Sequence, residues 1–232
     1  MRELNGTGVP LENRSTAFLA LILETNANRM ASMGGYVAAS HRFQSGPVAP
    51  AWEGQVNLYG TVRPHPALET RLEVFLDRVS FGPRLIEDLG DNRFLLSPLL
   101  PDSMSLTLRQ QWVVTPRLTL QAYAQLFTAY GAYGTYYEGV SDASRTPIRF
   151  ASLVPVEREN TEDFHDVALK LNMVLRWEYR LGSTLYVVYT HGQQRFPVAD
   201  GVRPPHTLMP RGLLAGAAND ALMVKWSWYW GA

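Results

Sequence analysis

The strongest constraint on the fold of this chain is an alternation of apolar and polar residues with a period of two. In Asp166–Arg180 every odd position carries an apolar side chain. Most even positions are polar, among them Lys170, Arg176 and Glu178. Because successive side chains of a β-strand point to opposite faces, the segment predicts a strand with one apolar and one charged face.

The same alternation recurs along the chain and predicts an all-β fold of about eight to ten strands. The segments are Thr16–Glu24, Met33–Phe43, Gln55–Arg63, Leu68–Arg78, Ser103–Val114, Leu118–Tyr130, Asp166–Arg180, Thr184–His191 and Asp220–Trp230. Strands of soluble proteins average about 5–6 residues, whereas a tilted strand that crosses a bilayer needs about 9–11. The lengths favour a transmembrane β-barrel, although a soluble barrel with its apolar face inward would alternate in the same way.

The lengths of the predicted connections also alternate. Four are short: Thr25–Ala31, Pro64–Ala67, Thr115–Arg117 and Leu181–Ser183. Four are long: Gln44–Glu53, Val79–Asp102, Gly131–His165 and Gly192–Asn219. Short periplasmic turns and long external loops are typical of outer-membrane barrels, so the order favours an antiparallel transmembrane barrel.

Aromatic residues gather where the strands approach the predicted short turns. An aromatic girdle at a membrane–water interface explains this placement, because the rings are apolar and their polar atoms stay hydrated. The predicted girdle comprises Trp112, Trp177, Tyr179, Trp226, Trp228 and Trp230.

The number and direction of the predicted strands suggest a truncated barrel. Bacterial single-chain barrels normally have an even number of strands, and nine are predicted. Neither Met1–Glu12 nor the short apolar run Ala17–Leu23 resembles a signal peptide, and no run of 18 apolar residues could form a transmembrane helix. We therefore expect residues 1–232 to be one β-barrel domain that is truncated at its N-terminal end.

The polar positions of the alternation include charged residues that we expect to face a barrel lumen. Charges that face lipid cost several kcal/mol, so such groups should point inward. They could form a selectivity lining for a pore or a ladder of mutually paired charges that fills the lumen, and we favour the ladder. These residues are Glu69, Arg71, Glu73, Asp77, Arg109, Lys170, Arg176, Glu178 and Lys225.

Composition and motifs argue against several other functions. The chain has 21 basic and 21 acidic residues, so nothing indicates nucleic-acid binding, and it has no cysteine. No histidine pair has metal-ligand spacing and no Gly-x-Ser-x-Gly motif occurs, so we expect no cofactor, no metal and no catalysis. His191 is the one histidine that could serve an outer-membrane lipid hydrolase. The acidic loop Glu157–Asp166 could bind a divalent cation, but solvation is the simpler interpretation.

Several stretches resemble a known family. They are Ser105–Arg109 (SLTLR), Thr115–Phe127 (TPRLTLQAYAQLF), Asp163–Asp166 (DFHD), Val174–Leu185 (VLRWEYRLGSTL) and Leu222–Gly231 (LMVKWSWYWG). Together they resemble the C-terminal barrel domain of outer-membrane proteins from myxobacteria and Bacteroidetes. Members usually carry an upstream module similar to family 9 carbohydrate-binding modules, which this chain lacks. They also usually have proline where Leu126 and Leu181 stand here.

These inferences lead to one expected function and two alternatives. We expect a bacterial outer-membrane β-barrel that acts as a membrane anchor or pore. Its partners would be outer-membrane lipid and, through the strand that ends at Trp228-Tyr229-Trp230, the barrel-assembly machinery. The alternatives are a soluble β-barrel that binds an apolar ligand inside and an outer-membrane lipid hydrolase.

Overall fold

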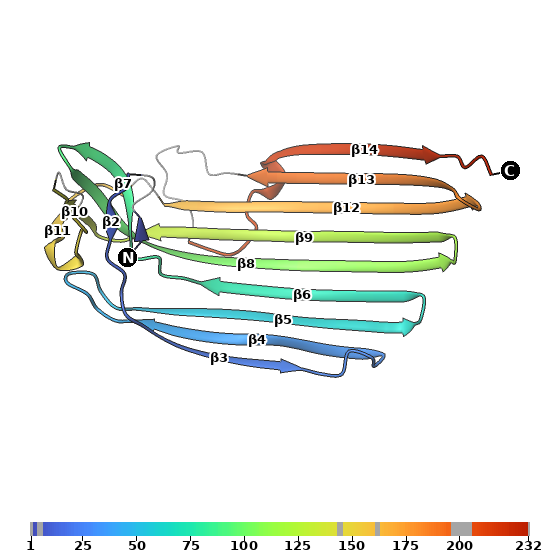
Figure 1. Cartoon of the computed structure of the whole chain (residues 1–232), viewed down its shortest axis with the longest axis horizontal. Helices are drawn as coiled ribbons and strands as arrows, with labels where there is room; N and C mark the ends of the chain where they lie inside the picture. Colours follow the sequence, from blue (N-terminus) through green and yellow to red (C-terminus); the bar gives the residue numbers. More distant parts are fainter. Residues whose placement is uncertain (1, 4–6, 143–145, 161–162, 196–205, 232) are drawn as a thin grey trace.

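The computed structural model describes residues 2–3, 7–142, 146–160, 163–195 and 206–231 and shows an all-β chain dominated by one antiparallel sheet (Figure 1). Within the described part, the main path of the sheet has nine strands in the order β14-β13-β12-β9-β8-β6-β5-β4-β3. Their bounds are β3 Thr16–Glu24, β4 Ala31–Arg42, β5 Ala51–His65, β6 Leu68–Arg78, β8 Arg93–Thr115, β9 Leu118–Tyr133, β12 Phe164–Arg180, β13 Ser183–Arg195 and β14 Ala217–Ser227.

The nine strands predicted from the alternation are all present, and each pairs with its predicted neighbour along the chain. The prediction was wrong at the last strand, because β14 ends at Ser227 and Trp228 and Trp230 lie beyond it. The short turns all lie at one end of the sheet, here named the turn end, and the long connections lie at the opposite loop end (Figure 1). At the β12–β13 turn, Gly182 has a φ of 76°, a conformation that glycine adopts without strain.

Two connections predicted as loops contain further strands. These are β7 Pro83–Gly90, β10 Tyr136–Val140 and β11 Val154–Val156, and β8 begins ten residues before the predicted strand. The β7–β8 hairpin turns through Asp91 and Asn92, which both have positive φ, as a tight turn compatible with strand twist requires. Two short pieces, β1 Arg2–Glu3 and β2 Pro10–Leu11, pair with each other, and the 3-10 helices are η1 Phe150–Ser152 and η2 Leu213–Ala215.

These additional strands build a cap at the loop end, which holds the hydrophobic core of the described residues. The core joins β2, the β4–β5 connection, β8, β10 and the segment 148–153. Its buried members are Val9, Leu11, Val48, Phe94, Leu96, Tyr137, Ile148, Phe150 and Leu153. The cap therefore has a conventional interior, whereas the long strands do not.

The sheet is open in this structure. β3 and β14 form its two edges, on opposite sides of the view in Figure 1, and do not pair with each other. The predicted antiparallel all-β architecture is thus confirmed, while closure into a barrel is not seen. Among the described residues, no helix is long and apolar enough to cross a membrane.

Candidate functional site

The register of the sheet sorts the side chains of the long strands onto two unlike faces. Residues that are directly opposite each other on paired strands share a face. One such row runs Val74–Leu106–Leu126–Leu169 across β6, β8, β9 and β12, and belongs to what we name the apolar face. The other side of the sheet is named the polar face.

The predicted lumen-facing residues lie on the polar face. The register assigns Glu69, Arg71, Glu73, Asp77, Arg109, Lys170, Arg176 and Lys225 to this one side. Glu178 follows the last regular pair of β12, and its carboxylate lies 3.7 Å from the guanidinium of Arg176. The register thus groups eight of the nine residues on one side of the sheet, and their orientation toward a lumen stays a prediction.

The polar face has a depression over its middle strands, and another depression, of about 610 Å³, lies mainly on the apolar face over β3, β4 and β5. A depression of about 540 Å³ lies over β6, β8, β9 and β12, lined mainly by polar-face residues that include Arg71, Arg109 and Tyr123. Small residues of the polar face, such as Thr61 and Thr107, are buried.

Only part of the charge on the polar face is paired. Arg63 contacts Glu69 at 2.6 Å, and Arg71 lies 3.7 Å from Glu73. Within the described residues, no carboxylate lies within 4 Å of the cationic groups of Arg109, Lys170 or Lys225. The ladder of mutual pairs that we favoured from the sequence therefore describes some of these residues and not others.

The described residues form no covering layer over most of the apolar face. Leu72, Leu108, Met173 and Val224 are 42–60% exposed although they lie within strands. Near the loop end the described segment 206–216 lies against the sheet, where the His206 ring stacks on Tyr130. A broad apolar surface of this kind marks contact with a partner or a membrane.

Five of the six predicted girdle residues form a connected aromatic group at the turn end. The ring of Tyr179 lies about 6 Å, centroid to centroid, from those of Trp177 and Trp228, and the Trp228 ring lies at the same distance from Trp226 and Trp230. Trp226 donates its indole N–H to the Tyr179 hydroxyl at 2.6 Å, and that hydroxyl donates to the carbonyl of Ser227 at 3.1 Å. Trp112 lies on β8, one row away from Trp177 on the apolar face.

The hydroxyl of Tyr179 should contribute measurably to stability. We expect Tyr179→Phe to lower the free energy of unfolding by about 1 kcal/mol, because the variant loses both hydrogen bonds while it keeps the ring contacts. Urea unfolding in detergent measures this loss. Tyr229→Phe removes a neighbouring hydroxyl for which no hydrogen bond is seen within the described residues, so an equal loss in that variant would contradict the assignment.

A second aromatic group lies at the loop end of the apolar face, and the sequence did not reveal it. The ring of His41 lies 4.4 Å from Trp52 and 5.0 Å from Phe43. Trp52 opposes His41 across β4 and β5 but belongs to the long predicted loop Gln44–Glu53, so its strand position was not apparent. Aromatic side chains therefore flank the exposed apolar surface at both ends.

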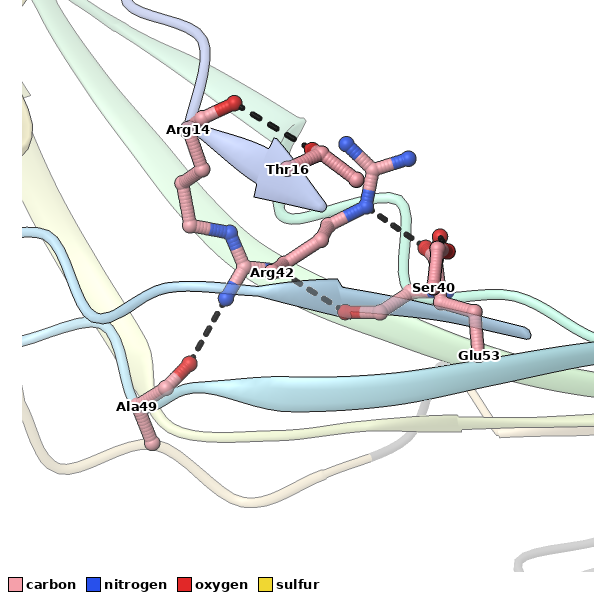
Figure 2. A network of polar contacts seen from close by, with 7 residues as sticks. Arg14, Thr16, Ser40, Arg42, Ala49 and Glu53 are labelled. Atoms are coloured by element: carbon pink, nitrogen blue, oxygen red, sulfur yellow. Dashed lines mark hydrogen bonds and ion pairs between the residues drawn. The ribbon is translucent and has the colours of Figure 1, made fainter. Parts of the chain in front are cut away.

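A buried ionic cluster ties the first strands together at the loop end (Figure 2). Arg14 precedes β3, yet its guanidinium donates to the carbonyl of Ala49 at 2.7 Å and to the hydroxyl of Ser80, beyond β6, at 2.8 Å. Glu53 on β5 accepts from Arg42, from Ser40 and from the backbone N–H of Ser80 at 2.6–2.7 Å.

The cluster brings the segments before β3 and after β6 together beside β5. β3 and β6 are separated by two strands in the sheet, and Arg14 reaches Ser80 across this distance. Burial lowers the pKa of Arg14, the charge of Arg42 lowers that pKa further and Glu53 raises it, but a guanidinium stays charged throughout.

Strand β3, at one edge of the sheet, does not have one apolar and one polar face. Phe18 and Ile22 of β3 lie on the polar face by register and are about 70% exposed. Between Thr16 and Glu24, which are polar, β3 is apolar on both sides.

The structure adds little support for two other predicted functional features, His191 and the acidic loop Glu157–Asp166. His191 pairs with Asp220 at 2.9 Å, and Tyr189 donates to the same carboxylate, but no serine is hydrogen-bonded to His191 within the described residues. In the acidic loop, Asp163 accepts from Asn160 and contacts His206, while Glu162 lies outside the described residues. Within the described ranges, no three His, Asp or Glu side chains gather as a metal site.

No protein-family model matches this chain, and neither a curated protein nor a solved structure does. The resemblance to outer-membrane barrel proteins therefore stays a prediction from the sequence.

Proposed function

We propose that this chain forms part of the wall of a transmembrane β-barrel in a bacterial outer membrane, as an anchor or as a pore. The observation that carries the proposal is a single-layer sheet with an apolar face that the described residues leave largely exposed and an opposite face that carries the charged residues. A lipid-facing barrel wall needs this arrangement, because its outer surface must be apolar and its interior can be polar.

The dimensions of the apolar face support the proposal. The apolar stretch of β12 runs from Val167 to Trp177, which are ten residues apart. At about 3.3 Å per residue and a tilt of about 45°, this stretch would span about 23 Å along the membrane normal. The apolar band of outer-membrane barrels is about 25 Å tall and is flanked by aromatic girdles. Aromatic residues also lie at both ends of this face.

The alternative of a soluble barrel with an apolar ligand inside is disfavoured by the same faces. Such a barrel would place the leucines around its ligand and the charges on its outer surface. Aromatic residues at both ends of the apolar face favour a lipid-facing surface instead, because aromatic residues flank the apolar band of membrane barrels.

We further propose that an odd number of strands from outside the described sheet completes the wall. With nine strands on an antiparallel path, β3 and β14 run in the same direction, as the arrows in Figure 1 show. Direct pairing of the two edges would therefore be parallel, whereas bacterial barrels are antiparallel and normally even-numbered. An odd number of added strands satisfies both conditions.

Detergent extraction, gel migration and bilayer recording test the proposal. We expect the protein to require detergent, to migrate faster unheated than boiled and, if the lumen is open, to give stepwise conductance in planar bilayers. A protein that is soluble and monodisperse without detergent would contradict the membrane assignment. Heat-modifiable migration without conductance would favour an anchor over a pore.

A further inference from the structure

A groove lies on the apolar face close to one edge of the sheet, over β3, β4 and β5. It is the depression of about 610 Å³, and apolar side chains line most of it. Among them Leu21, Met33 and Leu58 are 53–67% exposed although each lies within a strand. An apolar hollow that the described residues leave open suits an apolar ligand.

Glycine borders this groove at a position where packing does not require it. A Cβ added to Gly60 on β5 would meet no atom within 4 Å among the described residues. Gly35, which also borders the groove, differs, because its Cβ would collide with the carbonyl oxygen of Asn57. Glycine inside a strand weakens the strand and often marks a place where a ligand approaches the backbone closely. Gly60 therefore keeps the groove open at a cost to the stability of β5.

The groove continues into a more polar depression at the turn end. This second depression, of about 520 Å³, is lined by Thr25, Asn26 and Arg29 of the β3–β4 turn and shares Thr25, Met33 and Gly60 with the groove. Within the part of the chain that the structure describes, no carboxylate lies within 4 Å of the Arg29 guanidinium. A cation thus stands at one end of an apolar groove, an arrangement that fits an anionic amphiphile.

Two acids of the neighbouring strands are engaged on the other side of the sheet. Glu24 borders the groove, but the register places it on the polar face with Tyr59, whose hydroxyl donates to its carboxylate at 2.8 Å. Glu69, also on the polar face, is paired with Arg63 at 2.6 Å. The charge of Arg29 is therefore available to an anion from outside the described residues.

We propose that this surface binds a phospholipid, with one acyl chain in the groove over β3, β4 and β5 and the phosphate group bound by Arg29. The two parts of the site match the two parts of the ligand, since guanidinium groups bind phosphate oxygens and the groove buries hydrocarbon. The inference rests on the proposed function, because a lipid-facing wall places the short turns at the level of the lipid head groups. One lipid would then occupy a fixed site, whereas lipid over the rest of the apolar face exchanges freely.

Native mass spectrometry of the full chain in detergent, with dioleoylphosphatidylglycerol added, counts the bound lipids. We expect one lipid to bind more tightly than further copies. Arg29→Gln should weaken this first binding about tenfold, since hydrogen bonds between charged groups are strong. Arg117→Gln is the matched control and should leave the affinity unchanged, because Arg117 is exposed in the β8–β9 turn and the variant makes the same change in charge.

Gly60→Leu tests the groove itself. The new side chain would fill the groove without a clash, so we expect a folded protein that binds the lipid about tenfold more weakly, a change that the displacement of about two methylene groups produces. Gly54→Leu is the matched control, because Gly54 lies on the same strand and face but borders neither depression. Dioleoylglycerol has the same chains without the phosphate and should bind the wild type and Arg29→Gln equally. Circular dichroism and gel migration confirm that each variant is folded.

The outcomes separate this site from the proposed function. Equal first affinities in the wild type, Arg29→Gln and Gly60→Leu would overturn the site, while heat-modifiable migration would keep the barrel. Dimers that Gly60→Leu disrupts without a change in lipid binding would assign the groove to a second copy of the chain and would also overturn the site. Binding of a short-chain phosphatidylglycerol that depends on Arg29 and Gly60, in a protein that is soluble without detergent, would support the site and count against the barrel.

Discussion

Leu171→Arg should destabilise the protein by about 2–4 kcal/mol when it is folded in lipid vesicles, because a lipid-facing charge near the membrane midplane costs this much in a barrel. Leu171 lies near the middle of β12 on the apolar face, opposite Ala124 and His191. Under the proposed function its side chain faces acyl chains, where a guanidinium loses its hydration. Urea unfolding of the wild type and the variant in vesicles measures the difference.

Thr190→Arg is the matched control for this prediction. Thr190 opposes Asn172, the residue after Leu171, so it lies at nearly the same depth but on the polar face. It is exposed there, and the new arginine would remain hydrated in an aqueous interior. We expect a change below about 1 kcal/mol, typical of an exposed position. Equal losses in the two variants, or a larger loss in Thr190→Arg, would contradict the proposed orientation of the sheet.

The two faces could be predicted from the sequence because each depends only on neighbouring residues. A period of two fixes which side of a strand a residue occupies, whatever the strand pairs with. Lys170 and Leu171 were therefore assigned to opposite faces correctly without any knowledge of the fold. Strand order also followed, because consecutive strands with short turns pair with each other.

The positions of residues along each face could not be predicted, because they depend on the register between strands. The opposition of Arg71 and Arg109 becomes visible only when β6 and β8 are aligned across a long connection. For the same reason the alternation placed both arginines on the polar side without indicating that they face each other. A ladder of paired charges was favoured from the sequence, and the register shows that Arg109 does not belong to it.

The cap was missed because its strands are short and its core joins distant segments. β10 and β11 have five and three residues, too few for a period of two to stand out. Leu11 and Ile148 lie in one hydrophobic core although 137 positions separate them. The open edges could not be predicted either, because the alternation within a strand does not indicate that the outer edges of β3 and β14 pair with no strand of the sheet.

Glu53→Gln should lower the free energy of unfolding by about 2–4 kcal/mol, because removing one partner of a buried ion pair leaves the other charge uncompensated. The Glu53 side chain is 10% exposed and accepts from Arg42, Ser40 and the backbone of Ser80. A neutral amide cannot balance Arg14 and Arg42, and its NH₂ group would meet donors where the second carboxylate oxygen had been an acceptor. Urea unfolding in detergent, followed by gel migration and circular dichroism, measures the loss.

Glu69→Gln is the control variant that separates the effect of burial on stability from the effect of removing a charge. Glu69 is paired with Arg63 at the same 2.6 Å, but both side chains are about 40% exposed, and such pairs contribute about 0–1 kcal/mol. A much larger loss in Glu53→Gln would mean that the buried cluster fastens the segment before β3 to the strands up to β6. Similar small losses in both variants would show that the cluster at the loop end is hydrated, and β3 would then be held by its pairing with β4 alone.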